Sequence, residues 1–228
     1  MIYIGLDDTD NLDSSGTGHL ARALVDALRD RYDVFGITRH QLLRDSRVPC
    51  TKNNSSATVH LREKGPVDVA ALGDFVAAFV QEHSFPGSDP GVCVVSAVPA
   101  AVSAFGRRVQ SELVCRADAL ALAGEYGLYL RGLGGTEDGV IGALASVGLA
   151  ATGNDGRFIL VGTIRALSGV QPIDAVLAAG ISAVRTLEGE PVTAGLVDAA
   201  KLRPSLRDGQ PVLFVAPGGD VWQPLKLD

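Results

Sequence analysis

Apolar segments with strand-like and helix-like spacing alternate along most of this 228-residue chain. Residues 1–6 and 56–61 have the short apolar pattern of a strand, whereas the apolar side chains of residues 20–28 and 72–83 recur at helical spacing. Because such alternation is typical of a sheet covered by helices, the chain is predicted to belong to the α/β (α+β) class.

The same patterns predict further elements along the rest of the chain. The turn cluster "PGSDPG" precedes a buried strand, "VCVVSAV", and the glycine-rich region 125–135 indicates a boundary. Late in the chain, "QPVLFVAPGGDVWQPLKL" predicts a hairpin that turns at residues 217–220. The remaining expected elements are a strand at 34–43, helices at 102–113 and 140–147, a strand at 157–167, a short helix at 172–179 and a strand at 181–187.

Acidic residues outnumber basic ones, 26 to 20, which gives a net charge of −6. This balance removes any global electrostatic reason to expect a nucleic-acid binder, although a local basic patch stays open. Cys50, Cys93 and Cys115 lack metal-ligand spacing and are interpreted as reduced thiols. The N-terminus lacks the pattern of a signal peptide, and no apolar run is long enough to span a membrane. We therefore expect a soluble, cytoplasmic protein with no membrane partner.

Four carboxylates crowd the end of the first predicted strand, in "YIGLDDTDNLDSSGTGHLARAL". Asp7, Asp8, Asp10 and Asp13 would repel one another unless a cation or a proton relieved them. Two or three carboxylates with a few waters suit Mg²⁺, which prefers oxygen ligands and keeps part of its hydration. The spacing therefore indicates a magnesium site.

A loop of small residues follows and leads directly into the first predicted helix. Ser15, Gly16 and Gly18 would let an anion approach the backbone, and a helix N-terminus favours negative charge. A metal site beside such a loop is typical of phosphoryl transfer, and Thr17 would lie within reach of the bound phosphate. A plain turn with Thr17 as a helix cap explains the same residues, and no Walker-type motif supports the phosphate interpretation. Both interpretations stay open on spacing alone.

Five stretches resemble, in order, the archaeal isoleucine-tRNA 2-agmatinylcytidine synthetases. "IGLDDTDNLDSSGTGHLA" is similar to the family's aspartate-rich N-terminal signature, and "RHQLLRDSRVPCTKNNSSATVHL" to its second motif. "SDPGVCVV" and "GGTEDGVIGALASVGL" are similar to its Asn-Pro-Gly element and its glycine-rich helix. "LRPSLRDGQPVLFV" is a weaker match to a late Pro-Val-Leu region.

This resemblance implies a kinase-like domain at residues 1–124 followed by a ferredoxin-like domain at residues 125–228. In the family, the first domain binds ATP and Mg²⁺ and activates a cytidine carbonyl by phosphorylation. Asp7, Asp8 and Asp10 match the metal-binding aspartates of the family. Thr17 matches a threonine that is phosphorylated in the family. The resemblance therefore implies that Asp7, Asp8 and Thr17 act in catalysis. Four residues fall on the second motif, where polar and cationic groups would contact phosphate: Arg39, Thr51, Lys52 and Asn54.

The sequence also departs from the family pattern. Gly18 and His19 replace a threonine and an aromatic residue. None of the resembling stretches corresponds to the oligonucleotide-binding barrel or zinc ribbon that hold tRNA in the family, and the sequence has no Cys-x-x-Cys motif. We therefore expect a nucleotide and an unknown acceptor as ligands, without independent tRNA binding. Self-association or a partner subunit that presents nucleic acid stays open.

Two classes of function remain at this level. The first is an ATP- and Mg²⁺-dependent phosphotransferase or ligase-like enzyme that activates an oxygen of a small molecule or nucleobase. The second is a non-catalytic nucleotide-binding subunit that regulates or assists a partner. Carboxylates placed beside a phosphorylatable threonine favour the enzyme, because a pure binding protein has no need of that combination.

Overall fold

The protein is described by a computed structural model over residues 1–11, 16–48, 50 and 53–227. These residues form twelve strands, six α-helices and one short 3₁₀ helix. The strands follow one hydrogen-bonded path, β5-β4-β1-β3-β2-β6-β10-β11-β12-β9-β7, and β8 pairs with β11. The prediction of a mixed α/β fold is therefore confirmed.

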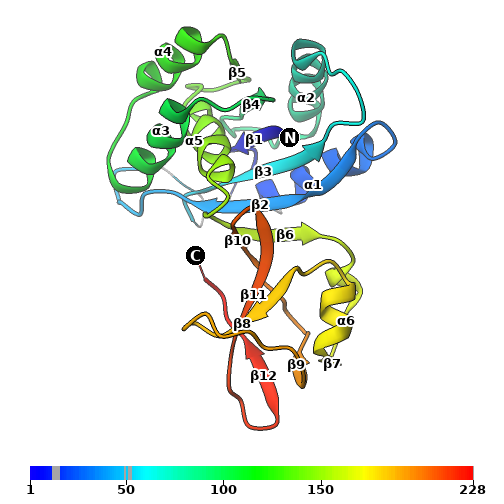
Figure 1. The fold of residues 1–228 in the computed structure, drawn as a ribbon. Helices are drawn as coiled ribbons and strands as arrows, with labels where there is room; N and C mark the ends of the chain where they lie inside the picture. The colour runs from blue at the N-terminus through cyan, green and yellow to red at the C-terminus, as the bar shows by residue number, and fades with distance from the viewer. Residues whose placement is uncertain (12–15, 49, 51–52, 228) are drawn as a thin grey trace.

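The first five strands form the antiparallel sheet seen in the upper half of Figure 1, with β1 at its centre. Every adjacent pair in this sheet is antiparallel. The strands are β1 (Ile2–Asp7), β2 (Asp33–Gln41), β3 (Ser55–Arg62), β4 (Gly91–Val95) and β5 (Tyr129–Gly132).

Helices cover both faces of this sheet. The helices α1 (Thr17–Leu28) and α2 (Val69–His83) pack on one face, where Ile2, Ile4 and Leu6 of β1 are completely buried. The other face carries α3 (Ala100–Ser111), α4 (Arg116–Tyr126) and α5 (Gly139–Ala151). The period of two along β1 explains this division, because alternate side chains of a strand point to opposite faces.

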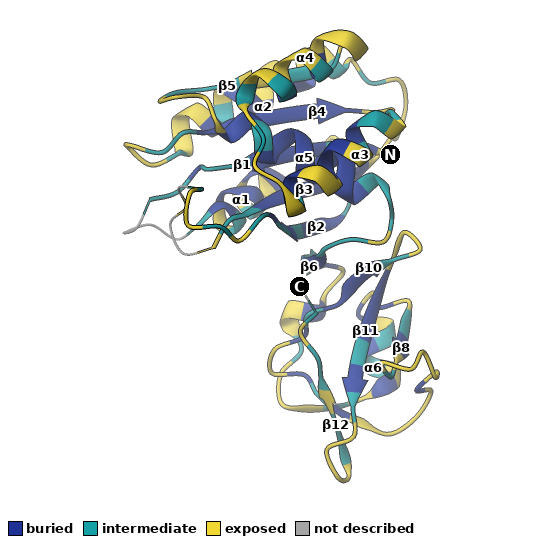
Figure 2. Cartoon of the chain, turned by 90° about the vertical axis from the view of Figure 1, so that its left-hand side faces the viewer, coloured by how far each residue is buried: buried dark blue, intermediate teal, exposed yellow. Residues whose placement is uncertain are grey.

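Helix α5 is buried along almost its whole length, as its dark blue colour in Figure 2 shows. It approaches β1 so closely that a Cβ atom on Gly5 would lie 2.0 Å from the carbonyl oxygen of Ala143. Only a residue without a side chain can occupy this position of β1. The close contact brings the start of α5 beside the end of β1.

The C-terminal part, residues 157–227, continues the sheet through β6 (Arg157–Val161), which pairs with both β2 and β10 (Ser205–Arg207). It has a core of its own that includes Phe158, Leu206 and Leu213. The strands β11 (Gln210–Ala216) and β12 (Val221–Pro224) are antiparallel, which confirms the predicted hairpin. The other elements are η1 (Ile164–Ala166), β7 (Val170–Pro172), α6 (Ile173–Ala178), β8 (Ala183–Arg185) and β9 (Leu196–Asp198).

The division of the chain into two domains at residue 124 stays a prediction, as does the ferredoxin-like character of the second. Strand β5 pairs with β4, and α5 packs against β1, β4 and α3. Because both elements complete the core of the first sheet, we propose that the boundary falls between α5 and β6. Residues 1–151 are called the N-terminal part below.

Several short elements were not predicted from the sequence, and α4 is the longest of them. Its buried residues are Ala119 and Ala123, so its apolar face is small and offers little periodic signal. The predicted helix at 102–113 ends at Ser111, and Leu113 is exposed. The strands β5, β7, β9 and β10 have three or four residues each, too few for a recognisable alternation.

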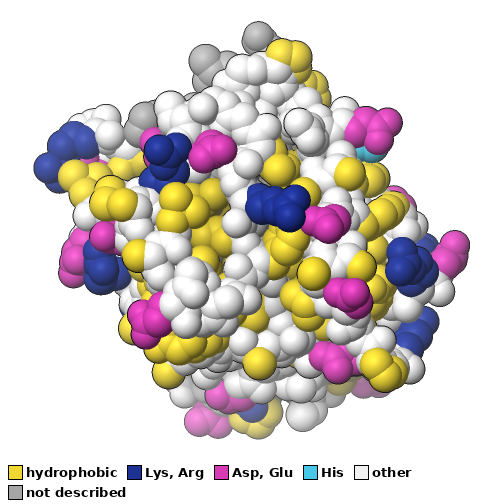
Figure 3. All heavy atoms as spheres, turned by 90° about the horizontal axis from the view of Figure 1, so that it is seen from above, with side chains coloured by type: hydrophobic (Ala, Val, Ile, Leu, Met, Phe, Trp, Pro, Cys, Tyr) yellow, Lys and Arg dark blue, Asp and Glu magenta, His cyan; other side chains and the backbone are white. Residues whose placement is uncertain are grey.

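Within the described part of the chain, no helix combines the length and the apolar character that a membrane span requires. The upper face of the molecule, shown in Figure 3, carries acidic and basic side chains interspersed among apolar ones. That face therefore presents no large patch of a single charge.

A buried polar cluster lies between β2 and β3. The Thr38 Oγ1 atom is 2.8 Å from His40 Nε2 and 2.7 Å from His60 Nε2. His40 Nδ1 lies 2.8 Å from a carboxylate oxygen of Asp155. Burial, with a smaller contribution from the charge of His40, lowers the pKa of His60 to about 3. His60 is therefore neutral in the folded protein at neutral pH.

This shift predicts a pH-dependent contribution of His60 to stability. Between its unfolded pKa of 6.5 and its folded pKa of about 3, the unfolded chain holds a proton that the folded chain excludes. The contribution should therefore be lost as pH falls below about 6.5, at a limiting slope of about 1.4 kcal/mol per pH unit. Urea unfolding at several pH values should show the stability difference between wild type and His60→Gln shrinking toward acid. The matched variant of exposed His83, His83→Gln, should keep the wild-type dependence of unfolding free energy on pH. A stability difference between wild type and His60→Gln that stays constant with pH would contradict the prediction.

Candidate functional site

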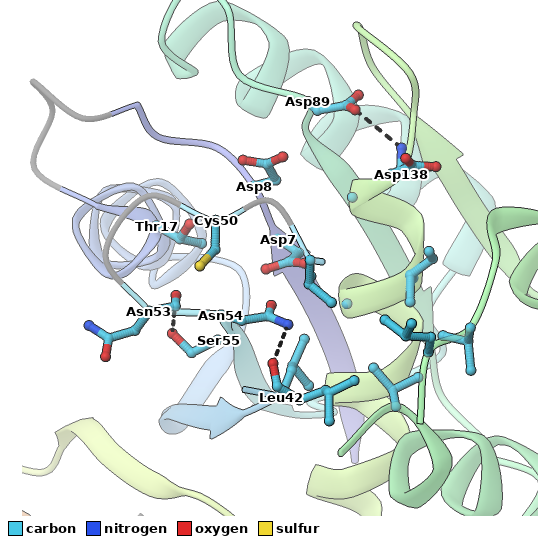
Figure 4. A pocket seen from close by; sticks show the side chains of 18 of the residues that line it. Asp7, Asp8, Thr17, Leu42, Cys50, Asn53, Asn54, Ser55, Asp89 and Asp138 are labelled. Carbon is cyan, nitrogen blue, oxygen red and sulfur yellow. Dashed lines mark hydrogen bonds between the residues drawn. The ribbon is translucent and has the colours of Figure 1, made fainter. Parts of the chain in front are cut away.

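A cavity of about 440 Å³ opens at the end of β1, as Figure 4 shows. We call it the acidic pocket, because six carboxylates line it and Arg47 is the one Lys or Arg among its described lining residues. Apolar side chains, including Leu42, Val109 and Ile141, form another part of its wall. The six carboxylates belong to Asp7, Asp8, Asp10, Asp89, Glu112 and Asp138.

The antiparallel register explains why these residues meet. Leu6 pairs with Ala57 of β3, and Asp7 pairs with Gly91 of β4. The end of β1 therefore lies beside the beginnings of β3 and β4, and the residues that precede these two strands also reach the pocket. In a parallel sheet the carboxyl ends of several strands would meet here. In this antiparallel sheet, β1 contributes its carboxyl end, whereas β3 and β4 contribute their amino ends.

Asp7 and Asp8 lie in an unfavourable setting for two negative charges. Burial and the neighbouring charge of Asp8 raise the pKa of Asp7 to about 8. Burial, followed by the charges of Asp89, Asp10 and Asp138, raises the pKa of Asp8 to about 6. Asp8 also has a positive φ of 47°, a strained conformation for a residue with a side chain. Carboxylates held in this way attract a cation.

The side chain of Asp7 has room only because residue 142 of α5 is glycine. A Cβ atom on Gly142 would lie 1.8 Å from Asp7 Oδ2 and 2.4 Å from Asp7 Cγ. The carboxylate of Asp7 therefore lies directly against the helix backbone. Nothing in the spacing of the sequence linked these two residues, which are 135 positions apart.

Asp89 orders the loop that leads into α5. Its carboxylate accepts hydrogen bonds from the backbone N–H groups of Thr136, at 3.1 Å, and Glu137, at 2.6 Å. It accepts further hydrogen bonds from the Thr136 hydroxyl and from Asp138 N–H. These contacts make Asp89 a structural residue at the wall of the pocket.

Thr17 is the first residue of α1 and is 8% exposed. Its hydroxyl donates a hydrogen bond of 3.0 Å to Asp10 Oδ1. The N-cap position belongs to Gly16, which has a φ of 84° and no capping side chain. The structure therefore does not support the alternative that Thr17 is the helix cap. The Thr17 hydroxyl is instead held by the Asp10 carboxylate, which accepts its hydrogen bond.

The donor set fits a divalent cation only in part. Among the described residues, no group of three or more His, Cys, Asp or Glu side chains is arranged to hold a metal ion. Mg²⁺ does not need such a group, because it is commonly bound through one or two carboxylates, waters and substrate phosphates. Asp7 and Asp8, with their raised pKa values, fit this second type of site. Metal binding by Asp7, Asp8 and Asp10 stays a prediction.

The predicted phosphate-binding residues do not all lie in one place. Asn54 lines the acidic pocket, but its side-chain amide donates a hydrogen bond of 2.9 Å to the carbonyl oxygen of Leu43 and so connects the segment before β3 to the segment after β2. Gly18 and Arg39 line a different cavity. Gly16 lies next to Thr17, and Ser15, Thr51 and Lys52 lie outside the described residues. The predicted catalytic, metal-binding and phosphate-binding residues do not include Asp89, Asp138 or Gly142, which also line the pocket; each lies in a stretch that carries the family resemblance.

The fold is similar to that of solved structures of tRNA-modifying proteins. One is a TiaS–tRNA(Ile2)–ATP complex, at 27% identity and a TM-score of 0.56, over 64% of this chain and 36% of that one. A second is a tRNA fluorescent labeling enzyme, at 25% identity and a TM-score of 0.55, over 64% of this chain and 35% of that one. Apo TiaS, a tRNA(Ile2) agmatidine synthetase, matches in fold at 24% identity and a TM-score of 0.54, over 64% of this chain and 35% of that one.

The chain thus has a TiaS-like α/β fold, and the match spans about a third of the length of each of these neighbours. No protein-family model matches the chain, and no curated protein matches it. The family resemblance drawn from the sequence is therefore confirmed as a likeness of fold.

The contact between Gly142 and Asp7 predicts that a methyl group at position 142 is harmful. We compare Gly142→Ala with Gly124→Ala, because Gly124 is an exposed residue of α4 where an added Cβ atom would meet open space. Both changes gain helix propensity, roughly 1 kcal/mol, but only the first forces Asp7 to move. Urea unfolding should place Gly142→Ala about 1–3 kcal/mol below Gly124→Ala in stability. Equal stabilisation of the two variants would show that Asp7 does not need this space.

Proposed function

We propose that this protein is an ATP-using enzyme of the tRNA-modifying class to which its structural neighbours belong. More specifically, it would activate an oxygen of a nucleobase or small molecule by phosphoryl transfer in the acidic pocket. A neighbour at 27% identity was solved with tRNA and ATP, which supports nucleotide use. Because the match spans 36% of that neighbour, its substrates are transferred here only as part of the proposal.

One observation carries the proposal: Asp7, Asp8 and Thr17 line the same cavity, and the Thr17 hydroxyl donates to Asp10. Phosphoryl transfer requires a site that offsets phosphate charge and a hydroxyl from which a proton can be removed. With a cation held by Asp7 and Asp8, the acidic pocket would offer both within reach of one ligand. A turn or a helix cap would require neither of them.

The proposed first step transfers the terminal phosphoryl group of ATP to Thr17. The Thr17 Oγ1 atom forms a bond to the γ-phosphorus while the bond between that phosphorus and the β,γ-bridging oxygen breaks, which releases ADP. The hydroxyl proton passes to Asp10 Oδ1, 3.0 Å away. In the second step the acceptor oxygen attacks the same phosphorus, the bond to Thr17 Oγ1 breaks, and the threonine oxygen recovers its proton from Asp10.

Asp7 and Asp8 would hold a divalent cation in this reaction. When bound, such a cation neutralises negative charge on the phosphate oxygens as the transfer proceeds. The carboxylates alone would repel a nucleotide, because their own charges already oppose one another. The two aspartates are therefore proposed to act through the cation, and Thr17 and Asp10 through covalent and proton transfer.

The apolar wall of the acidic pocket is the proposed place for the acceptor. Leu42, Val109 and Ile141 line the same cavity as the carboxylates. A flat ring could pack on such a wall while its polar edge faces Thr17, which is how small-molecule sites commonly combine apolar and polar groups.

The metal-binding part of the proposal predicts the effect of Asp8→Asn. This change keeps the size of the side chain but removes a charge, so Mg²⁺-dependent ATP turnover should fall by roughly 100-fold or more. Calorimetry should show weakened binding of Mg²⁺-ATP. The control is Asp33→Asn, which removes an exposed carboxylate of β2 and should leave both measurements unchanged. Full turnover in Asp8→Asn would contradict the assignment.

The phosphoryl-relay part predicts the behaviour of Thr17. Thr17→Val keeps the shape of the side chain but lacks the hydroxyl, so mass spectrometry after incubation with Mg²⁺-ATP should find no phosphate on that variant. Wild type and Thr17→Ser should carry one phosphate at residue 17. This measurement needs no acceptor, so it can be made before the acceptor is identified.

The same experiment separates the enzyme from the non-catalytic alternative. Wild-type protein that binds Mg²⁺-ATP but never carries phosphate at Thr17 would contradict the relay. A Thr17→Val variant that turns over ATP like the wild type would do the same.

A further inference from the structure

A second cavity, of about 760 Å³, lies where the N-terminal and C-terminal parts meet. Two of its cations come from the N-terminal part, Arg22 of α1 and Arg39 of β2. Five more come from the C-terminal part: Arg157, Arg165, Lys201, Arg203 and Lys226. We call this hollow the basic cavity.

The charge of the basic cavity is exceptional for this protein. Seven of the chain's 20 Lys and Arg residues line it, although the net charge of the chain is −6. Asp198 is the one carboxylate among its described lining residues, and that carboxylate accepts a hydrogen bond of 2.9 Å from the backbone N–H of Ala200. Because charges of one sign that converge on a concave surface reinforce each other's field, the cavity should attract anions strongly.

Two of these arginines are placed directly opposite each other in the sheet. Arg39 of β2 pairs in register with Arg157 of β6, and Arg157 is 6% exposed. Like charges opposite each other on neighbouring strands are destabilising. The Arg39 Nε–H group donates a hydrogen bond of 2.8 Å to the hydroxyl of Ser55. The register of β2 and β6 therefore places two like charges at one wall of the basic cavity.

The cations of the basic cavity also repel across its width. Burial and the charge of Arg165 lower the pKa of Arg22. Burial, followed by the charges of Arg157 and Arg165, lowers the pKa of Arg203. Arg165 of η1 is thus close enough to act on residues from both parts of the chain. A multiply charged anion between them would turn this repulsion into attraction.

We propose that the basic cavity binds a compact oligophosphate, a ligand with two or more adjacent phosphate groups, and that it does so without a divalent cation. The planar guanidinium group presents paired N–H donors that match phosphate oxygens, and five of the seven cations are arginines. A volume of about 760 Å³ accommodates a ligand of nucleotide size. The site is independent of the function proposed for the acidic pocket.

The form of the cavity favours a compact ligand over an RNA strand. The cations converge on one hollow from α1, β2, β6, η1 and the C-terminal segments, and they do not form a track along the surface. Sites for single-stranded nucleic acid commonly add aromatic side chains on which bases stack. Among the described residues that line the basic cavity there is no Phe, Tyr or Trp. Recognition therefore rests on the phosphate groups.

Neighbouring residues at the start of α1 line the acidic pocket and the basic cavity. Thr17 lines the acidic pocket, whereas the next two residues, Gly18 and His19, line the basic cavity. A Cβ atom on Gly18 would lie 3.0 Å from Ile159 Cδ1, so the glycine keeps α1 close to β6 at this edge. The two hollows have opposite charge and should therefore differ in their need for a metal.

The test uses the full chain, with inorganic tripolyphosphate as the probe and EDTA in the buffer. Calorimetry should detect binding that weakens steeply when salt is raised from about 50 to 200 mM. Arg165→Glu, at an exposed position, should weaken binding by about tenfold or more, while Lys64→Glu makes the same charge change on the exposed surface and should leave it unchanged. Asp8→Asn should bind tripolyphosphate like the wild type, which separates this site from the acidic pocket.

Several results would overturn the proposal. Absence of binding by the wild-type chain, or equal binding by Arg165→Glu, would remove the site. Binding that requires Mg²⁺ and is lost in Asp8→Asn would place the oligophosphate in the acidic pocket instead. A third arm uses a single-stranded RNA without terminal phosphate: tighter binding of this RNA than of tripolyphosphate, lost in Arg165→Glu, would identify a nucleic-acid surface in place of the proposed site.

Discussion

The contact between α5 and β1 is the constraint on which the rest of the structure depends. Two glycines permit it: Gly5 lets the strand approach the Ala143 carbonyl, and Gly142 leaves space for the Asp7 carboxylate. Because α5 is almost wholly buried, it cannot move away from the sheet without opening the core. The acidic pocket is therefore a consequence of backbone packing, and its most perturbed carboxylate is held by the core itself.

The antiparallel order of the first sheet determines which segments reach this pocket. Since β3 and β4 run opposite to β1, the residues before them, Asn54 and Asp89, lie at the end of β1. Asp89 then accepts hydrogen bonds from the loop before α5. The end of β1, the segment before β4 and this loop therefore meet at one wall of the pocket. Burial, followed by the charges of the neighbouring carboxylates, raises the pKa of both Asp7 and Asp8, and a bound cation would relieve the charge repulsion.

Much of the fold could be predicted from local pattern. Strands with clear alternation, such as 56–61, and helices with a broad apolar face, such as 72–83, lie close to their expected positions in β3 and α2. Helix α4 and the three-residue strands could not be predicted, because each buries too few side chains to produce a period. Asp7, Asp8 and Thr17 were identified as neighbours of a common site because they are close in sequence, and the structure brings them to one cavity.

By itself, the sequence determined the mixed α/β class, the aspartate cluster at the end of β1 and the position of Thr17 at the start of α1. Only the tertiary structure decided that Gly142 faces Asp7, that Asp89 reaches Asp8, and that Gly18 and Arg39 belong to a different cavity from Thr17. The reason is physical: strand and helix periods are local and can be read along the chain, whereas these contacts depend on strand register and on the distance between packed elements. The basic cavity is the clearest case, because its seven cations are dispersed through an acidic sequence and converge only when β2 pairs with β6.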